Sequence, residues 1–439
     1  MTCVMTWSVA SPPWAAERRR PRRATVTADM LHTEPALARQ HLETIFHAAL
    51  AAVDGRAVVR RFLGNRPPAG RIAVVAIGKA GAAMLAGARE APGVQLFSAL
   101  LITKPGHFDA SLERDDRITC LQGGHPLPDE YSLAAGTRLL RFLAGLPADL
   151  PVLFLLSGGA SSLVEVLPDG VSLDLLRRAN RWLIGSGLDI RAVNRVRQAL
   201  SAIKGGRLAA WLGKRPASVL LISDVPGDDP AIIGSGPLYP DALAARELPA
   251  LPDWLVLPPA GKMPCCEETL PHHVVASLAD ALTAAAACAA DMGYPARVMP
   301  EALAGPAESA AQHIAQQLLS AAPGIYLWGG ETTVVLPDQP GQGGRNQQLA
   351  LAAALVLQGQ QAILLLAAGT DGNDGSTSAA GAIVDGLSTS RAASAGQDAA
   401  NALRRADAGT CLAAAGDVLL TGPTGTNVMD IVIGLRMPD

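Results

Sequence analysis

Short apolar segments that each end in a loop of glycine, aspartate or serine constrain the fold of this chain more than any other feature. Three examples are RIAVVAIGKAG at 71–81, PVLFLLSGGASS at 151–162 and SVLLISDVPGDD at 218–229, with helical patterning between them. Such an alternation predicts a parallel sheet with crossover helices. Ligands of parallel sheets bind outside the carboxyl ends of the strands, which is where these loops lie.

The length of the chain and a change in its character favour two domains. At 439 residues, the chain exceeds what one compact core usually organises. The proline-rich segment from Leu248 to His273 interrupts the alternation, as a linker would. Further strand-to-loop units follow, and the alternation within 329–336 and 426–435 favours antiparallel pairing in a mixed second sheet. The predicted division is a disordered extension at 1–30, an N-terminal α/β domain at 31–265, a helical linker region at 266–322 and a C-terminal domain at 323–439.

Composition excludes several classes of partner. Hydrophobic residues make up 49% of the chain, but no uninterrupted apolar run reaches the roughly 18–20 residues that a membrane span needs. The formal net charge of −3 gives no electrostatic reason to expect nucleic-acid or anionic-membrane partners. The six cysteines lack metal-ligand spacing, which favours reduced thiols. We therefore expect a cytoplasmic, globular protein, either a monomer or a homodimer.

Two glycine-rich turns are candidates for binding an anion. SGGASS, from Ser157 to Ser162, follows an apolar run and precedes a helical pattern, so backbone N–H groups and a helix dipole would converge there. GQGGRNQQ, at 341–348, places three glycines before Arg345 at the start of another helical pattern. Either segment alone could equally be an ordinary tight turn. IGKAG adds Lys79 after the first expected strand, although the chain has neither a P-loop nor a G-x-G-x-x-G dinucleotide fingerprint.

Acidic loops supply a complementary chemistry. The loop after one expected strand carries Asp224, Asp228 and Asp229, and the loop after another carries Asp371 and Asp374. Carboxylates near phosphates usually hold Mg²⁺ or accept the proton of a substrate hydroxyl. For any one of these residues taken alone, turn formation or helix capping is the simpler explanation. Several such loops in one α/β chain favour a protein that handles a phosphorylated ligand and an anionic partner.

Basic and imidazole side chains accompany these loops. His107 and His125 lie at the ends of expected strands, where they could contact a ligand or serve only as surface or capping residues. Lysine and arginine would offset the charge of phosphates and of a carboxylate substrate during phosphoryl transfer. The basic candidates are Lys79, Lys104, Arg195, Arg197, Lys204 and Arg345.

The ordered motifs resemble one family, the glycerate 2-kinases with a C-terminal MOFRL domain, whose members also carry the name hydroxypyruvate reductase. The resemblance extends from about Arg39 to Leu435. The collinear segments that carry it are AIGKAG, TKPGH, GGHPLPDEYS, LSGGASSLVE, VNRVRQALSAIKGGRLA, ISDVPGDDPAIIGSGP, GGETTVVL, GQGGRNQQLALA, GTDGNDGSTSAAGA and LLTGPTGTNVMDIVIG.

The resemblance implies ATP-dependent phosphorylation of D-glycerate to 2-phosphoglycerate, with Mg²⁺. It also implies an α/β fold of two α/β/α domains, with the active site in the cleft between them. The N-terminal domain would be Rossmann-like with a mostly parallel sheet, and the C-terminal MOFRL domain would have a mixed sheet. NAD(P)H-dependent reduction of hydroxypyruvate is the alternative, although the dinucleotide fingerprint is missing. A metabolite sensor without catalysis is a third class.

The resemblance also implies roles for individual residues. The family pattern commonly has glycine where Ala160 stands, which is compatible with phosphate binding, and aspartate where Ser378 stands, so Ser378 is left out of the expected site. The implied catalytic residues are Lys79, Arg345 and Asp224. The implied nucleotide-binding residues are Ser157, Gly158, Gly159, Ser161, Gly343, Gly344 and Asp371. The implied metal ligands are Asp224 and Asp228.

Overall fold

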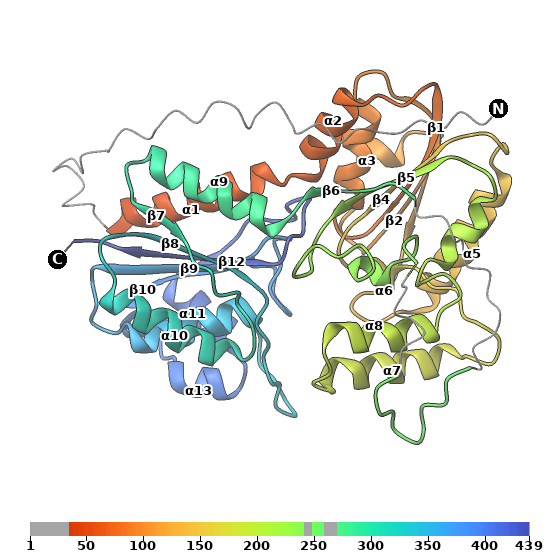
Figure 1. Cartoon of the computed structure of the whole chain (residues 1–439). Helices are drawn as coiled ribbons and strands as arrows, with labels where there is room; N and C mark the ends of the chain where they lie inside the picture. The colour runs from red at the N-terminus through yellow and green to blue at the C-terminus, as the bar shows by residue number, and fades with distance from the viewer. Residues whose placement is uncertain (1–34, 241–247, 259–269, 439) are drawn as a thin grey trace.

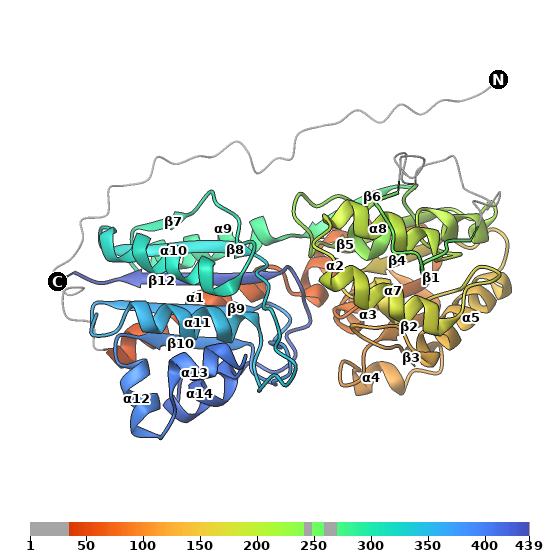
Figure 2. The ribbon, with the colours of Figure 1, turned by 90° about the horizontal axis from the view of Figure 1, so that it is seen from below.

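The computed structural model describes residues 35–240, 248–258 and 270–438, so the extension predicted at 1–30 lies outside the described residues. The described chain forms two lobes, each built on a six-stranded sheet with helices on both faces (Figure 1, Figure 2). Among the described helices, none combines the length and the apolar character that crossing a bilayer requires. The predicted α/β class with two α/β/α units is confirmed.

The first sheet is parallel throughout and has the strand order β3-β2-β1-β4-β5-β6. This is the doubly wound order, in which the strand order reverses between β1 and β4. All five residues of β4 are buried, as expected for a strand covered on both faces. The Rossmann-like prediction is therefore confirmed. The strands are β1 (Arg71–Ile77), β2 (Gln95–Thr103), β3 (Ile118–Gln122), β4 (Val152–Leu156), β5 (Ala217–Ile222) and β6 (His272–Ala276).

Helices cover both faces of the first sheet. α2 and α3 pack together on one face, and α5 and α6 lie on the other. Asp129 begins α5 by accepting the backbone N–H of Ser132, which completes a reciprocal capping box. α7 and α8 share a small apolar cluster of their own. The helices are α2 (Gly55–Asn65), α3 (Gly81–Glu90), α4 (Ala110–Glu113), α5 (Glu130–Gly145), α6 (Ala160–Leu163), α7 (Leu173–Gly185) and α8 (Ile190–Ala199), with the 3₁₀ turns η3 (Arg207–Leu212) and η4 (Ile233–Ser235).

The second sheet is mixed, as predicted, with the strand order β11-β10-β9-β12-β8-β7. Its β7–β8 pair is parallel and its other pairs are antiparallel. The strands are β7 (Ala296–Val298), β8 (Gly324–Gly330), β9 (Ile363–Gly369), β10 (Gly381–Asp385), β11 (Val418–Leu419) and β12 (Asp430–Arg436). The helices of this lobe are α1 (Pro35–Ala52), α9 (Leu278–Asp291), α10 (Ala307–Ser320), α11 (Arg345–Val356), α12 (Ser388–Ser394), α13 (Ala399–Arg404) and α14 (Ala408–Ala415).

Only part of the alternating segment at 329–336 is a strand. β8 pairs antiparallel with β12, as the alternation suggested, but β8 ends at Gly330. Gly330 has a φ of +143°, and a Cβ there would lie 2.4 Å from the carbonyl oxygen of Leu303. The pairing with β12 stops at Gly330, which faces the first residue of β12, and Val335 and Leu336 beyond it are exposed. The expected alternation therefore marks a surface loop at this point.

The chain crosses between the lobes twice. As a result, two elements belong to a different lobe from the one that their position in the sequence suggests. α1, at the start of the described chain, packs against α9, β9 and β12 of the second lobe (Figure 1). β6 lies within the predicted linker region and pairs with β5 of the first sheet. By packing, α1 therefore goes with the second lobe and β6 with the first. The domain boundaries given from the sequence stay a prediction.

Candidate active site

The loops after β1 and β4 interlock at the carboxyl edge of the first sheet. The backbone N–H of Lys79 donates to the carbonyl oxygen of Gly158 at 2.9 Å, and the N–H of Ala80 donates to Ser157 Oγ at 3.0 Å. Gly78 allows this approach, because a Cβ there would lie 2.2 Å from Ser157 Oγ. Ser157 is fully buried. Its hydroxyl therefore holds the two turns together inside the protein.

The glycines of the SGGASS turn make room for side chains from elsewhere. A Cβ on Gly158 would lie 2.0 Å from Asp224 Oδ2 and 2.1 Å from Asn427 Nδ2. Gly159 has a φ of +85° and precedes α6, which is only four residues long. Such a short helix contributes little of the dipole that was expected to attract an anion here. Ser161 Oγ lies 2.8 Å from Ser235 Oγ, so this hydroxyl also has a partner within the protein.

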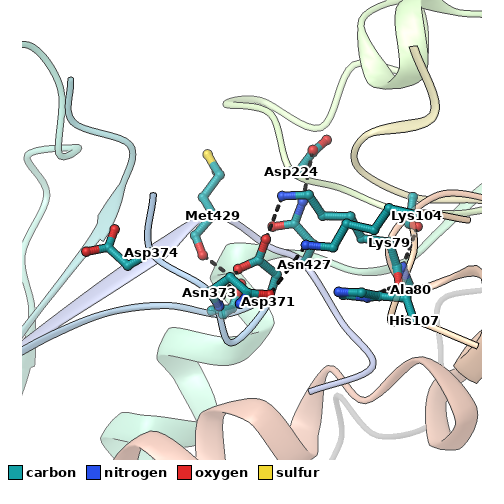
Figure 3. Close-up of polar contacts among 12 residues, drawn as sticks. Lys79, Ala80, Lys104, His107, Asp224, Asp371, Asn373, Asp374, Asn427 and Met429 are labelled. Carbon is teal, nitrogen blue, oxygen red and sulfur yellow. Dashed lines mark hydrogen bonds and ion pairs between the residues drawn. The ribbon is translucent and has the colours of Figure 1, made fainter. Parts of the chain in front are cut away.

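Lys79 reaches from the first lobe to the second. Its Nζ donates to Asp371 Oδ2 at 2.5 Å, and Asp371 lies two residues beyond the end of β9 (Figure 3). Lys104 Nζ donates to Asn373 Oδ1 at 3.3 Å on the same loop. Burial would raise the pKa of Asp371, but the Lys79 ammonium outweighs it and keeps that pKa below its usual value. Burial and the neighbouring Lys79 lower the pKa of Lys104.

Asp224 lies at the centre of this group, directly beyond β5. Asn427 Nδ2 donates to Asp224 Oδ2 at 3.2 Å, which is a third side-chain contact between the lobes (Figure 3). Burial, reinforced by the negative charge of Glu331, raises the pKa of Asp224 to about 6. A carboxylate with this pKa is ionised at neutral pH and can still take up a proton.

Arg345 is held from two sides by carboxylates. Its Nε and Nη2 donate to Asp430 at 2.5 and 3.0 Å, in a two-pronged pair, and its Nη1 forms an ion pair with Glu331. Burial would lower the pKa of Arg345, but Asp430 and Glu331 raise it. Lys79 and Arg345 both act on Glu331, whose pKa is raised by burial and lowered by each of them.

The N-terminus of α11 does bind an anion, but the anion is a side chain of the protein. The N–H groups of Asn346 and Gln347 donate to Asp374 at 3.1 and 2.8 Å. A Cβ on Gly344 would lie 2.3 Å from Asp374 Oδ1, and Gly343 donates its N–H to Ser376 Oγ at 3.2 Å. Gly343 and Gly344 were expected to bind a nucleotide at this helix start. The carboxylate of Asp374 already fills that position. Burial raises the pKa of Asp374 to about 6.

Several candidates lie apart from this group. Asp228, with a φ of +53°, is half-buried, and no side-chain hydrogen bond or ion pair joins it to the group in the described chain. Lys204 pairs with Glu165 in the protein interior, and Arg197 Nε donates to Asn180 Oδ1 at 3.1 Å. These two cations stabilise the first lobe. The part of the chain that the structure describes holds no group of three or more His, Cys, Asp or Glu side chains arranged for a metal ion.

Sequence reasoning missed three members of the group. Glu331 follows β8, Asp430 begins β12, and Asn427 lies in the loop before it. Glu331 follows an apolar strand, as Asp224 and Asp371 do, whereas Asn427 precedes an apolar strand and Asp430 begins it. The signal that identified Asp224 and Asp371 was therefore present for Glu331 but not for the other two. Met429, between two of them, has a φ of +71°, which is unusual for a residue other than glycine.

Comparison with known proteins gives two matched families and several relatives. Residues 41–253 match the family described as Domain of unknown function (DUF4147), and residues 324–430 match the MOFRL family. A "Putative hydroxypyruvate reductase" of Agrobacterium vitis is 41% identical over 416 residues, which covers 90% of this chain and 93% of the relative. A "D-glycerate 2-kinase" of Thermotoga maritima is 36% identical over 381 residues, which covers 83% of this chain and 90% of the relative.

A solved structure matches the whole arrangement. The crystal structure of a glycerate kinase from Thermotoga maritima aligns with a TM-score of 0.77 and 33% sequence identity. The alignment covers 92% of this chain and 100% of that one. The likeness therefore includes both lobes and the residues between them.

Proposed function

We infer that this chain, which belongs to the glycerate kinase family, transfers a phosphoryl group from ATP to the 2-hydroxyl of D-glycerate. The observation that carries this function is the group of opposite charges that the two lobes share. Lys79 and Asp224 come from the first lobe, and Asp371 and Arg345 come from the second. We place the active site between the lobes at this group.

The two cations suit the transition state of phosphoryl transfer. Charge in that state is spread over the phosphoryl oxygens, so catalysis depends on positioning and on preorganised positive charge. An ammonium carries three N–H donors, and Lys79 uses one of them on Asp371. The other two are suited to phosphoryl oxygens. Asp430 holds the Arg345 guanidinium in one orientation, so the cation needs little reorganisation as the reaction proceeds.

Asp224 is the residue suited to accept the proton of the 2-hydroxyl. Burial and Glu331 raise the pKa of Asp224 to about 6, close to the working pH, which is where a general base is most effective. Asn427 donates to one carboxylate oxygen and so orients the group. Proton transfer to the other oxygen would leave a nucleophilic alkoxide facing the phosphoryl group.

Magnesium is the second cofactor that we propose, together with ATP. Mg²⁺ at phosphoryl-transfer sites is typically held by one or two carboxylates plus the phosphates themselves. Asp224 fits this requirement as an alternative to the role of base, because no cation is bonded to its carboxylate among the described residues and the carboxylate stands near Glu331 and Asp371. When bound, the ion offsets charge on the phosphates. We also propose Asp228 as a metal ligand, and the support for it is that it lies on the same loop as Asp224.

Reduction of hydroxypyruvate is the second candidate, because relatives carry that name. The strand order of the first sheet also occurs in dinucleotide-binding domains. The turn after β1, however, reads IGKAG, and its lysine is bonded to Asp371. A dinucleotide pyrophosphate needs glycines and free N–H groups at that turn. This difference favours the kinase.

A coupled assay separates the two functions. We expect ADP formation that requires D-glycerate, and a product that enolase converts directly to phosphoenolpyruvate without a phosphoglycerate mutase, as 2-phosphoglycerate requires. Arg345→Ala should abolish this turnover or reduce it by orders of magnitude, roughly 10²-fold or more. Oxidation of NADH by hydroxypyruvate in the absence of ATP, without glycerate-dependent ADP formation, would show that the chain is a reductase.

We further propose that the enzyme acts in the cytoplasm as a monomer or homodimer. Cys120, Cys288 and Cys411 are free thiols in the described chain, as in proteins of reducing compartments. Sedimentation of the purified full chain at several concentrations would distinguish a monomer from a dimer. A larger assembly would contradict the proposal.

A further inference from the structure

A cavity of about 390 Å³ opens at the carboxyl ends of β2 and β3. Pro105, just beyond β2, and Gln122, the last residue of β3, line it together with residues of the following loop. That loop contributes His125 and Leu127, and Tyr131 comes from the first turn of α5. The cavity therefore lies at the edge of the first sheet where doubly wound folds bind their ligands.

His125 connects this cavity to the turn that lies against Lys79. A Cβ on Gly159 would lie 3.1 Å from His125 Cδ2 and 3.3 Å from Nε2, and 3.4 Å from Cγ of Lys79. The His125 ring is thus a shared wall between the cavity and the Gly158–Gly159 turn. Burial, followed by the charges of Lys79 and Lys104, lowers the pKa of His125 to about 3, so the ring is neutral at pH 7.

The lining suits an uncharged aromatic group. No lysine or arginine among the described residues lines the cavity, so an anion such as glycerate has no counter-charge there. Oδ1 of Asp129 is already used, because the N–H groups of Gly124 and Ser132 each donate to it at 2.9 Å. Tyr131 stands at the rim with 58% of its surface exposed, although its ring is largely apolar. An exposed aromatic beside a cavity offers a stacking surface for a planar ring.

We propose that this cavity binds the adenine and ribose of ATP, with Tyr131 stacked on the base and His125 separating the base from phosphates beside Lys79. The Gln122 amide offers both a donor and an acceptor to the edge of the base. The volume is within the range of pockets that hold small organic ligands, about 300–1,000 Å³. The proposal rests on the proposed function, since it is ATP that joins an aromatic base to a chain of phosphates.

The first test is Tyr131→Ala. Stacking of a base on an aromatic side chain corresponds to roughly a 5- to 150-fold difference in affinity. We expect the variant to raise the KM for ATP and the Kd for ADP at least fivefold, and to leave the affinity for inorganic tripolyphosphate unchanged. Tyr131→Phe keeps the ring and should restore most of the ADP affinity. Trp211→Ala removes another exposed aromatic of the first lobe, away from the cavity, and is the matched control.

The second test locates the base directly. Photo-cross-linking of the full chain with 8-azido-ADP should label the peptide at 122–131, and excess ADP should prevent the labelling. Labelling confined to another part of the chain, or an unchanged Kd for ADP in Tyr131→Ala, would overturn the proposal. Glycerate-dependent ADP formation by the wild type tests the proposed function separately. Labelling at 122–131 without such turnover would retain the base site and reject the kinase.

Discussion

Arg345 and Arg391 are two arginines with the same exposure and different surroundings. Each has 35% of its side chain exposed and pairs with two carboxylates, Arg345 with Asp430 and Glu331, and Arg391 with Asp385 and Asp417. Only Arg345 lies in the group shared by the lobes. A lysine cannot reproduce the two-pronged pair of a guanidinium with a carboxylate. We therefore expect Arg345→Lys to lower kcat about 10²-fold, the magnitude typical of one lost charge-stabilising donor.

Arg391→Lys is the matched control for this substitution. Both variants lose a comparable ion-pair geometry, so we expect similar and small changes in the midpoint of thermal unfolding. The kcat of Arg391→Lys should stay within about twofold of the wild type, because Arg391 is remote from the proposed phosphoryl site. Equal kcat values for the two variants, measured at saturating ATP and glycerate, would show that Arg345 has a structural role only.

Gly158 gives a second prediction at the scale of a residue. A Cβ at this position would overlap Asp224 Oδ2 and Asn427 Nδ2 at 2.0 and 2.1 Å, so alanine must displace the contact between the lobes. We expect Gly158→Ala to lower kcat/KM by roughly 10²-fold, since a misplacement of about 1 Å in a catalytic group has effects of this size. Gly145→Ala is the control, because a Cβ at Gly145 has no neighbour within 4 Å. Wild-type activity in Gly158→Ala would remove Asp224 from the mechanism.

The sequence was sufficient to locate Lys79 and Asp224 at the ends of strands. It was insufficient to identify the residues that each of them contacts. Polar residues that directly follow an apolar strand must lie at the carboxyl edge of a parallel sheet, so their location follows from a local pattern. The partner of Lys79 is Asp371, 292 positions away, and depends on how two separate sheets face each other. No local pattern carries that information. Asn427 was missed for the same reason, because it becomes informative only when the lobes are placed together.

At the scale of an element, α11 shows why a glycine-rich helix start is ambiguous in a sequence. The pattern at 341–348 predicted a helix, which begins at Arg345, and left open whether an anion lies at its N-terminus. The anion is Asp374, and a carboxylate supplied by another loop satisfies the same N–H donors as a bound phosphate. The alternation at 329–336 failed differently, because the pairing of β8 with β12 ends at Gly330 and the strand does not continue beyond it.

Asp374 also predicts a pH dependence of stability. Its pKa is about 6 in the fold, because of burial, against 3.8 for an ordinary aspartate, so the folded state binds the proton more tightly. The stability from this raised pKa is fully present below about pH 3.8 and is lost as the pH rises through about 6. Asparagine cannot titrate. Between pH 5 and pH 7, we expect the wild type to lose roughly 1 kcal/mol of unfolding free energy relative to Asp374→Asn.

Urea unfolding at several pH values measures this difference. Asp398→Asn, the same substitution at the exposed cap of α13, shows the general effect of replacing a capping carboxylate by an amide. The trend with pH should remain after that effect is subtracted. A difference between wild type and Asp374→Asn that grows in favour of the wild type toward pH 7 would mean that the N–H donors of α11 dominate over burial.

At the scale of the whole molecule, the two lobes share one apolar core. A single buried cluster runs from the α2–α3 face of the first sheet to the α1–α9 face of the second. α1 is essential to this continuity, because it packs against the second lobe although the chain then enters the first. The spacing of apolar residues in α1 predicted a helix correctly. The same spacing could not predict which lobe the helix would cover, since an apolar stripe fits any apolar face.

Phe46 on α1 tests whether the lobes unfold together. The side chain is fully buried within the shared cluster, so Phe46→Ala should lower the unfolding free energy by about 3–5 kcal/mol. Because the core is continuous, we expect one shifted transition in which activity and helical content are lost together. His47→Ala, the adjacent exposed position, should leave the transition in place. Two separate transitions in Phe46→Ala, with only the first one shifted, would mean that the lobes are independent folding units and that their contacts at Asp224 and Asp371 form only after each has folded.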